Sequence, residues 1–171
     1  MDAIVYTSNT GSTARYAQLL SEKTGLPAYP LDEAQRSLPA NAEVIYLGWV
    51  MASGIQGLKT AAKRFKLRAV CSVGMGRTGT QTELLRSKNP VPDPVPLFTL
   101  QGTFDLNKLR GVYRAMMNVM VKTVGKKLSA KPDRSPDEDD MLDMMLNGSE
   151  RVSAENLTAV TDWYATTAEH K

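Results

Sequence analysis

Short apolar runs alternate with amphipathic stretches along the first hundred residues. The runs typical of β-strands are AIVYT (3–7), PAYPL (27–31), AEVIYLGWV (42–50), LRAVCSVGMG (67–76) and VPLFTLQG (95–102). Between them, residues 12–25, 55–65 and 80–89 place apolar side chains at helical spacing. This alternation predicts an α/β fold, a doubly wound parallel sheet with helices on both faces. For five strands we expect the order 2-1-3-4-5, with the proline-containing second strand at an edge.

The pattern changes after residue 105. Residues 105–128 form a long predicted helix with a broad apolar stripe backed by basic residues. An acidic helix is expected over 138–148, and a final helix from Ser153, its N-cap, to the end of the chain. We therefore expect a single domain over 1–171, in which residues 105–150 form a helical extension after the fifth strand.

Six methionines of this extension leave two interpretations open. They either pack two helices together or form an adaptable surface for a cofactor or partner. They are Met116, Met117, Met120, Met141, Met144 and Met145.

The composition is that of an ordinary globular domain. The chain has 171 residues, of which 42% are hydrophobic and 23% charged. No apolar run approaches the roughly 18–20 residues of a membrane-spanning helix, and we see no secretory signal at the start. The single cysteine, Cys71, lies in an apolar run and fits a reducing compartment. We expect a cytoplasmic protein.

Charge is distributed unevenly. Residues 1–131 carry 18 Lys and Arg against 8 Asp and Glu, whereas residues 132–171 carry 3 against 10. The basic part favours an anionic partner or peripheral membrane contact through the helix 105–128. Alternatively, the acidic segment lies over the basic part and offsets it. We expect no nucleic-acid partner.

The loop TSNTGSTAR (7–15) joins the first strand to the first helix. In doubly wound folds this rim binds ligands, and a phosphate there meets the N–H groups and positive end of the helix. Gly11 allows close backbone approach, and four small hydroxyl residues can donate hydrogen bonds: Ser8, Thr10, Ser12 and Thr13. Neither a P-loop lysine nor a three-glycine dinucleotide fingerprint is present. The other interpretation is a capped turn with no ligand.

The segment Ser8-Asn9-Thr10-Gly11-Ser12-Thr13 resembles the flavodoxin signature [T/S]-x-T-G-x-T. The segments VIYLGWVMASGIQGLKTAAKRF, VCSVGMG and LFTLQGTFDLNKLRGVYRAMMNVMVK, with the late Thr161-Asp162-Trp163, look like the branch that contains the menaquinone-dependent protoporphyrinogen dehydrogenases. The resemblance spans nearly the whole chain in order. It implies a flavodoxin-like three-layer fold that binds FMN.

The resemblance also implies a set of cofactor-binding residues. The phosphate would lie on Ser8, Asn9, Thr10, Gly11, Ser12 and Thr13. The isoalloxazine would lie between the loop of Val50, Met51, Ala52, Ser53 and Gly54 and the loop of Val73, Gly74, Met75 and Gly76, with Gln101 and Gly102 as further candidates.

Two features depart from the pattern of the family. Many flavodoxins stack an aromatic residue on the ring, but the matching position here holds Ala52 or Ser53. Trp49 falls too early, and a place in the core is the alternative for it. Flavodoxins are also acidic, whereas this chain is basic.

No side chain is singled out as a catalytic acid, base or metal ligand. The only histidine, His170, is one residue from the end of the sequence. The expected function is electron transfer through FMN to or from a partner reductase. The alternative is a dehydrogenase that oxidises a reduced tetrapyrrole with a quinone acceptor, and a flavin-free binding module also stays open.

Overall fold

The structure, a computed structural model, describes residues 1–103, 105, 111–148 and 150–168. Its centre is a mostly parallel β-sheet. The parallel strands are β1 (Ala3–Thr7), β2 (Ala28–Pro30), β3 (Glu43–Met51), β5 (Lys66–Gly74) and β6 (Leu97–Gln101). They lie in the order β2-β1-β3-β5-β6, so the α/β class predicted from the sequence is confirmed.

The sheet differs from the prediction by one strand. The two-residue strand β4 (Gly54–Ile55) pairs antiparallel with the end of β3, so the described sheet has six strands rather than five. The predicted numbering of the order, 2-1-3-4-5, is therefore wrong, although the five parallel strands keep the relative places expected for them. Two residues are too few for an apolar period to show in the sequence.

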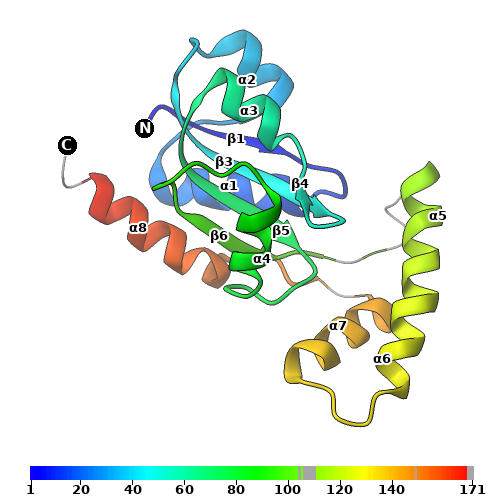
Figure 1. Cartoon of the computed structure of the whole chain (residues 1–171). Helices are drawn as coiled ribbons and strands as arrows, with labels where there is room; N and C mark the ends of the chain where they lie inside the picture. Colours follow the sequence, from blue (N-terminus) through cyan, green and yellow to red (C-terminus); the bar gives the residue numbers. More distant parts are fainter. Residues whose placement is uncertain (104, 106–110, 149, 169–171) are drawn as a thin grey trace.

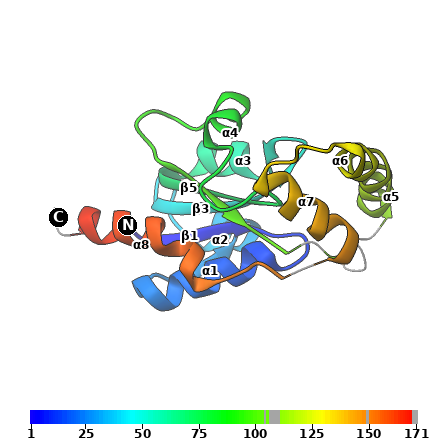
Figure 2. The same cartoon turned by 90° about the horizontal axis from the view of Figure 1, so that it is seen from below.

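Helices cover both faces of the sheet (Figures 1 and 2). On one face, α2 (Leu31–Ser37), α3 (Leu58–Arg64) and α4 (Thr82–Lys88) contribute to one buried cluster. On the other, α1 (Ser12–Thr24), the 3₁₀ turn η2 (Ala154–Leu157) and α8 (Thr158–Ala168) contribute to a second. The central strand β3 is buried on both faces between them, as its continuous apolar run predicts.

Local signals account for some of the helix boundaries. α1 ends at Gly25, whose φ of 74° is the left-handed conformation that glycine adopts readily. Ser153 caps η2 by accepting a hydrogen bond from the Glu155 N–H. The helix α2 was not predicted from the sequence, because its seven residues place only Ala34 in the core.

The predicted helix 105–128 continues two residues further than expected, and its expected first residue, Asp105, is not helical. It consists of α5 (Gly111–Met120), a π-helical turn η1 (Val121–Gly125) and α6 (Lys126–Ala130), while residues 106–110 lie outside the described part. None of the residues of α5 is buried. Together with α6 it lies at the end of the molecule opposite α8 in both views (Figures 1 and 2).

The acidic helix α7 (Pro136–Asn147) lies between this long helix and the sheet (Figures 1 and 2). Ser135 and Glu138 form a reciprocal capping box at its start. Hydrogen bonds from Lys131, and then from the Ser135 backbone, hold the pKa of the exposed Glu138 carboxyl below its usual value. Met144 and Met145 are buried, which confirms the packing interpretation for these two methionines.

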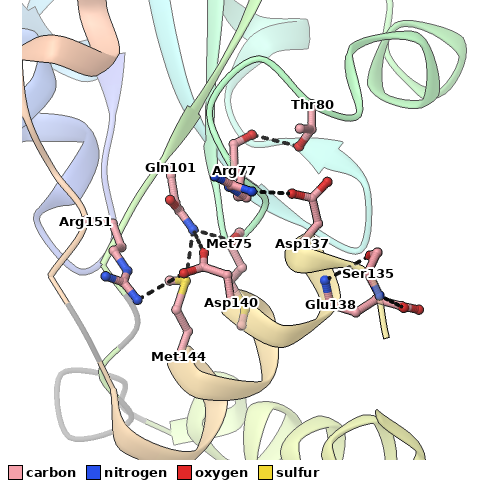
Figure 3. Close-up of polar contacts among 10 residues, drawn as sticks. All are labelled: Met75, Arg77, Thr80, Gln101, Ser135, Asp137, Glu138, Asp140, Met144 and Arg151. Atoms are coloured by element: carbon pink, nitrogen blue, oxygen red, sulfur yellow. Dashed lines mark hydrogen bonds and ion pairs between the residues drawn. The ribbon is translucent and has the colours of Figure 1, made fainter. Parts of the chain in front are cut away.

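Every carboxylate of α7 has a cationic partner. Asp137 pairs with Arg77 at 3.3 Å, Glu138 with Lys131 at 2.7 Å and Asp139 with Arg134 at 2.5 Å (Figure 3 draws the first). Asp140 and Asp143 both pair with Arg151, at 3.0 and 3.2 Å. The acidic segment therefore offsets part of the basic charge, as one of the two interpretations of the sequence expected.

Among the described residues, no helix combines the length and the apolar character needed to cross a bilayer.

Candidate functional site

A cavity of about 490 Å³ opens at the carboxyl ends of the parallel strands. Its walls come from the loops that follow β1, β3, β5 and β6 and from helices α5 and α7. The volume lies within the range of about 300–1,000 Å³ that small-molecule sites occupy. Open parallel sheets bind ligands at this edge, beside the reversal in strand order between β1 and β3.

The loop after β1 forms the hydroxyl-rich side of the cavity, where Asn9, Thr10, Ser12 and Thr13 line the wall. Gly11 has a φ of 102°, and a Cβ built on it meets no atom within 4 Å, so its backbone faces open space. The Ser8 Oγ accepts a hydrogen bond from the Ala14 N–H at 3.3 Å.

The first helical turn of α1 keeps free donors. The N–H groups of Ser12 and Thr13 donate to no other residue in the described part of the chain. They belong to the positive end of a 13-residue helix. This end of the cavity can therefore take an anion through neutral donors.

The β3–β4 hairpin forms another wall and contains backbone strain. Met51 pairs with Gly54, so Ala52 and Ser53 are the two turn residues, with φ values of 47° and 64°. Such turns prefer asparagine and glycine, because other side chains are strained at positive φ. Both strained residues line the cavity.

Asn89, at the end of α4, holds this hairpin in place. Its Oδ1 accepts from the Ile55 N–H at 2.7 Å, and its Nδ2 donates to the Ser53 and Leu85 carbonyls, each at 2.8 Å. Sequence reasoning missed this residue, because an asparagine at a helix end is an ordinary signal for a turn.

The Tyr46 hydroxyl holds the chain that follows β4 against the end of β1. The Tyr46 hydroxyl lies 2.6 Å from the Gln56 carbonyl and 2.8 Å from the Thr7 Oγ1. Gly57 approaches so closely that a Cβ there would lie 2.2 Å from the Tyr46 oxygen. Burial, opposed by the Thr7 hydrogen bond, raises the pKa of Tyr46 to about 12, so its hydroxyl stays neutral.

The loops after β5 and β6 form the floor between these walls. Val73, Gly74, Met75, Gly76 and Gly102 line it. The Gly102 N–H donates to the Gly74 carbonyl at 2.7 Å, and the Thr103 N–H donates to the Ser12 Oγ at 3.0 Å, so the floor is bonded to the hydroxyl-rich loop.

Tyr16 of α1 connects the end of β6 to the segment before α8 through hydrogen bonds of its hydroxyl. Its hydroxyl donates to the Gln101 carbonyl at 2.5 Å and accepts from the Asn156 Nδ2 at 2.7 Å. Burial raises the pKa of the Tyr16 hydroxyl, against the opposing effect of its hydrogen bonds.

The outer wall is apolar and comes from the helical extension and from Trp49 of β3. Trp49 and Tyr113 meet edge to face, with ring centroids 5.6 Å apart, and four methionines line the cavity beside them. These are Met116, Met117, Met120 and Met141. A place in the core for Trp49 is wrong: it is half-buried at the rim and absent from both core clusters.

The structure brings together thirteen of the residues expected at the site. Those lining the cavity are Asn9, Thr10, Ser12, Thr13, Val50, Met51, Ala52, Ser53, Val73, Gly74, Met75, Gly76 and Gly102. Ser8, Gly11, Gly54 and Gln101 are not among them. The Gln101 side chain turns to α7 instead, where its Nε2 donates to the Asp140 carboxylate; it also donates to the Met75 carbonyl of the loop after β5, at 3.4 Å (Figure 3).

The described lining contains one charged side chain, Asp105, and neither histidine nor cysteine. No group of three potential metal ligands occurs among the described residues, and His170 lies outside them. The lining suits binding and orientation of a ligand with an apolar part and a part that accepts hydrogen bonds.

No family model, curated protein or solved structure matches the chain.

Proposed function

We propose that the protein is a flavodoxin-like redox protein that binds FMN in this cavity. One observation carries the proposal: a single cavity joins a loop with free N–H and hydroxyl donors to an apolar wall of aromatic and methionine side chains. FMN has the same two parts, a phosphate and a planar isoalloxazine ring. A capped turn without a ligand would need neither the cavity nor its apolar wall.

The residues present fit the cofactor. The Ser12 and Thr13 N–H groups and the Thr10 hydroxyl would hold the phosphate, with Gly11 allowing close approach. The hairpin of β3 and β4 and the Gly74–Gly76 loop would lie on either side of the ring. The aromatic residue expected on the ring in many flavodoxins would come from Trp49 or Tyr113, which lie outside the position of the family motif.

Bound FMN supplies the electron transfer itself. The protein would orient the ring, exclude water from its apolar side and set its potential through backbone contacts. The electrons would pass to or from a partner reductase. We place this activity in the cytoplasm, where the single buried thiol of Cys71 fits a reducing compartment.

A second candidate is oxidation of a reduced tetrapyrrole with a quinone as acceptor. The apolar wall favours it, because Trp49, Tyr113 and the methionines offer adaptable apolar surface to a second ring system beside the flavin.

The test is an absorbance spectrum of the purified protein, followed by reduction in anaerobic titration. We expect flavin bands, release of FMN on denaturation, and uptake of added FMN by the stripped protein. A protein that has no bands and takes up no FMN would contradict the proposal.

The titration also separates the two candidates. Reduction in two resolved one-electron steps, without turnover of a reduced tetrapyrrole, supports the electron carrier. Reduction in one two-electron step, together with quinone-dependent oxidation of the tetrapyrrole, supports the dehydrogenase.

A further inference from the structure

The long helix α5–η1–α6 carries four exposed cations, Arg114, Lys122, Lys126 and Lys127. None of them forms an ion pair with another residue of the described chain. We call these four the helix cations.

The nearby acidic helix does not neutralise the helix cations. All five carboxylates of α7 are paired with Arg77, Lys131, Arg134 and Arg151. α7 lies on the side of the long helix that faces the sheet (Figure 2). A strip of uncompensated positive charge therefore remains.

The same helix exposes apolar side chains. Val112, Met116 and Val119 follow the i, i+4, i+7 spacing of one helix face and are 79%, 42% and 63% exposed. Met116 also lines the cavity at its edge, together with Tyr113, Met117 and Met120 on the neighbouring face, whereas Val112 and Val119 do not line it. Apolar residues exposed together on one face indicate an interaction surface.

Its chemistry fits a flat anionic surface. A helix with an apolar face and basic residues lies in the interface of a bilayer, where apolar side chains enter the headgroup boundary and cations meet anionic lipids. A second copy of the chain fits poorly, because a two-fold contact through this face would bring the helix cations of both copies together. The position of α5 at one end of the molecule leaves it accessible to a flat surface (Figure 1).

We propose that residues 111–130 form a docking helix that binds the surface of anionic lipid bilayers. The cavity shares this helix, so docking places the cavity beside the lipid surface.

The experiment is co-sedimentation of the full chain with vesicles of phosphatidylcholine alone or mixed with phosphatidylglycerol. The test variant replaces three of the helix cations (Lys122→Gln, Lys126→Gln and Lys127→Gln). The control removes the same charge from exposed positions on the α/β body (Lys59→Gln, Lys63→Gln and Lys88→Gln). A third variant, Val112→Ser with Val119→Ser, tests the apolar face, and far-ultraviolet circular dichroism checks that each variant folds.

We expect binding to the mixed vesicles that weakens with added salt and little binding to phosphatidylcholine. The test variant should bind about a hundredfold more weakly, on the order of fivefold for each charge, and the control nearly as the original chain does. The valine variant should lose about fivefold or more.

Three outcomes would overturn the proposal. They are no binding to mixed vesicles, equal losses in the test and control variants, and a concentration-dependent dimer that the valine changes abolish. The last result would assign the face to a second copy of the chain.

Discussion

At the scale of single residues, the loop after β1 makes the sharpest prediction for the proposed cofactor. Thr10→Val keeps the shape of the side chain and removes its hydroxyl donor from the cavity wall. A hydrogen bond to a charged group contributes about 1.5–3 kcal/mol, so we expect FMN affinity to fall about tenfold or more. Fluorescence quenching of added FMN measures it, with Thr60→Val on the exposed side of α3 as the control.

The folding stability of Thr10→Val should change little, because its hydroxyl makes no hydrogen bond within the described chain. Gly11→Val is a harsher change, since a β-branched residue at a φ of 102° is strained even without a ligand. Unchanged FMN affinity in both variants would contradict the assignment of this loop to the phosphate.

At the scale of elements, Asn89 connects α4 to the strained hairpin. Asn89→Ala removes three hydrogen bonds and leaves the Ile55 N–H and the Ser53 carbonyl without that partner. We expect the free energy of unfolding to fall by about 1–3 kcal/mol, and amide hydrogen exchange to rise in the β3–β4 hairpin.

The control is Asn118→Ala, which changes an exposed asparagine of α5. Exchange that rises equally throughout the protein, and not first in the hairpin, would show that Asn89 does not hold this element.

The elements that the sequence predicted well are those in which the spacing of apolar residues matches the faces that are buried. β1, β3 and β5 have continuous apolar runs because both of their faces are covered, and α1 has a clear stripe and a glycine end. β4 and α2 bury too few residues to leave a pattern in the sequence.

Part of the candidate site could also be located from the sequence, and part could not. The loops after β1, β3 and β5 could be located from the sequence because each follows a recognisable strand. The outer wall could not, because the positions of Tyr113 and Trp49 against each other depend on how the extension packs. Gln101 shows the opposite case: it has the expected place in the chain, but its side chain bonds to α7.

At the scale of the whole molecule, buried acidic groups make stability depend on pH in the alkaline range. Burial raises the pKa of the Cys71 thiol from 9.0 to about 12, and that of the Tyr46 hydroxyl from 10.0 to about 12. The folded state keeps these protons while the unfolded chain loses them. Their contribution to stability is therefore complete below pH 9 and is lost as the pH rises from 9 towards 12.

Urea unfolding at pH 8 and pH 11 measures this loss. Cys71→Ala removes one of the titrating groups, so its stability should fall less between the two pH values, by on the order of 2 kcal/mol. The smaller side chain also lowers the free energy of unfolding of the variant at pH 8. The test therefore compares the change in the free energy of unfolding from pH 8 to pH 11 in the two proteins. An equal fall in both proteins would show that the thiol ionises as easily in the folded state.

The helix α5 has no buried residue, yet it forms a wall of the cavity with Tyr113, Met117 and Met120. Whatever fills the cavity would add packing partners to the contact that Tyr113 makes with Trp49. Trypsin cleavage after Arg114 should therefore slow when the cavity is filled, whereas cleavage after exposed residues of α3 should not. The rate of cutting at one bond thus becomes a label-free way to screen small molecules, whether or not they are coloured like a flavin.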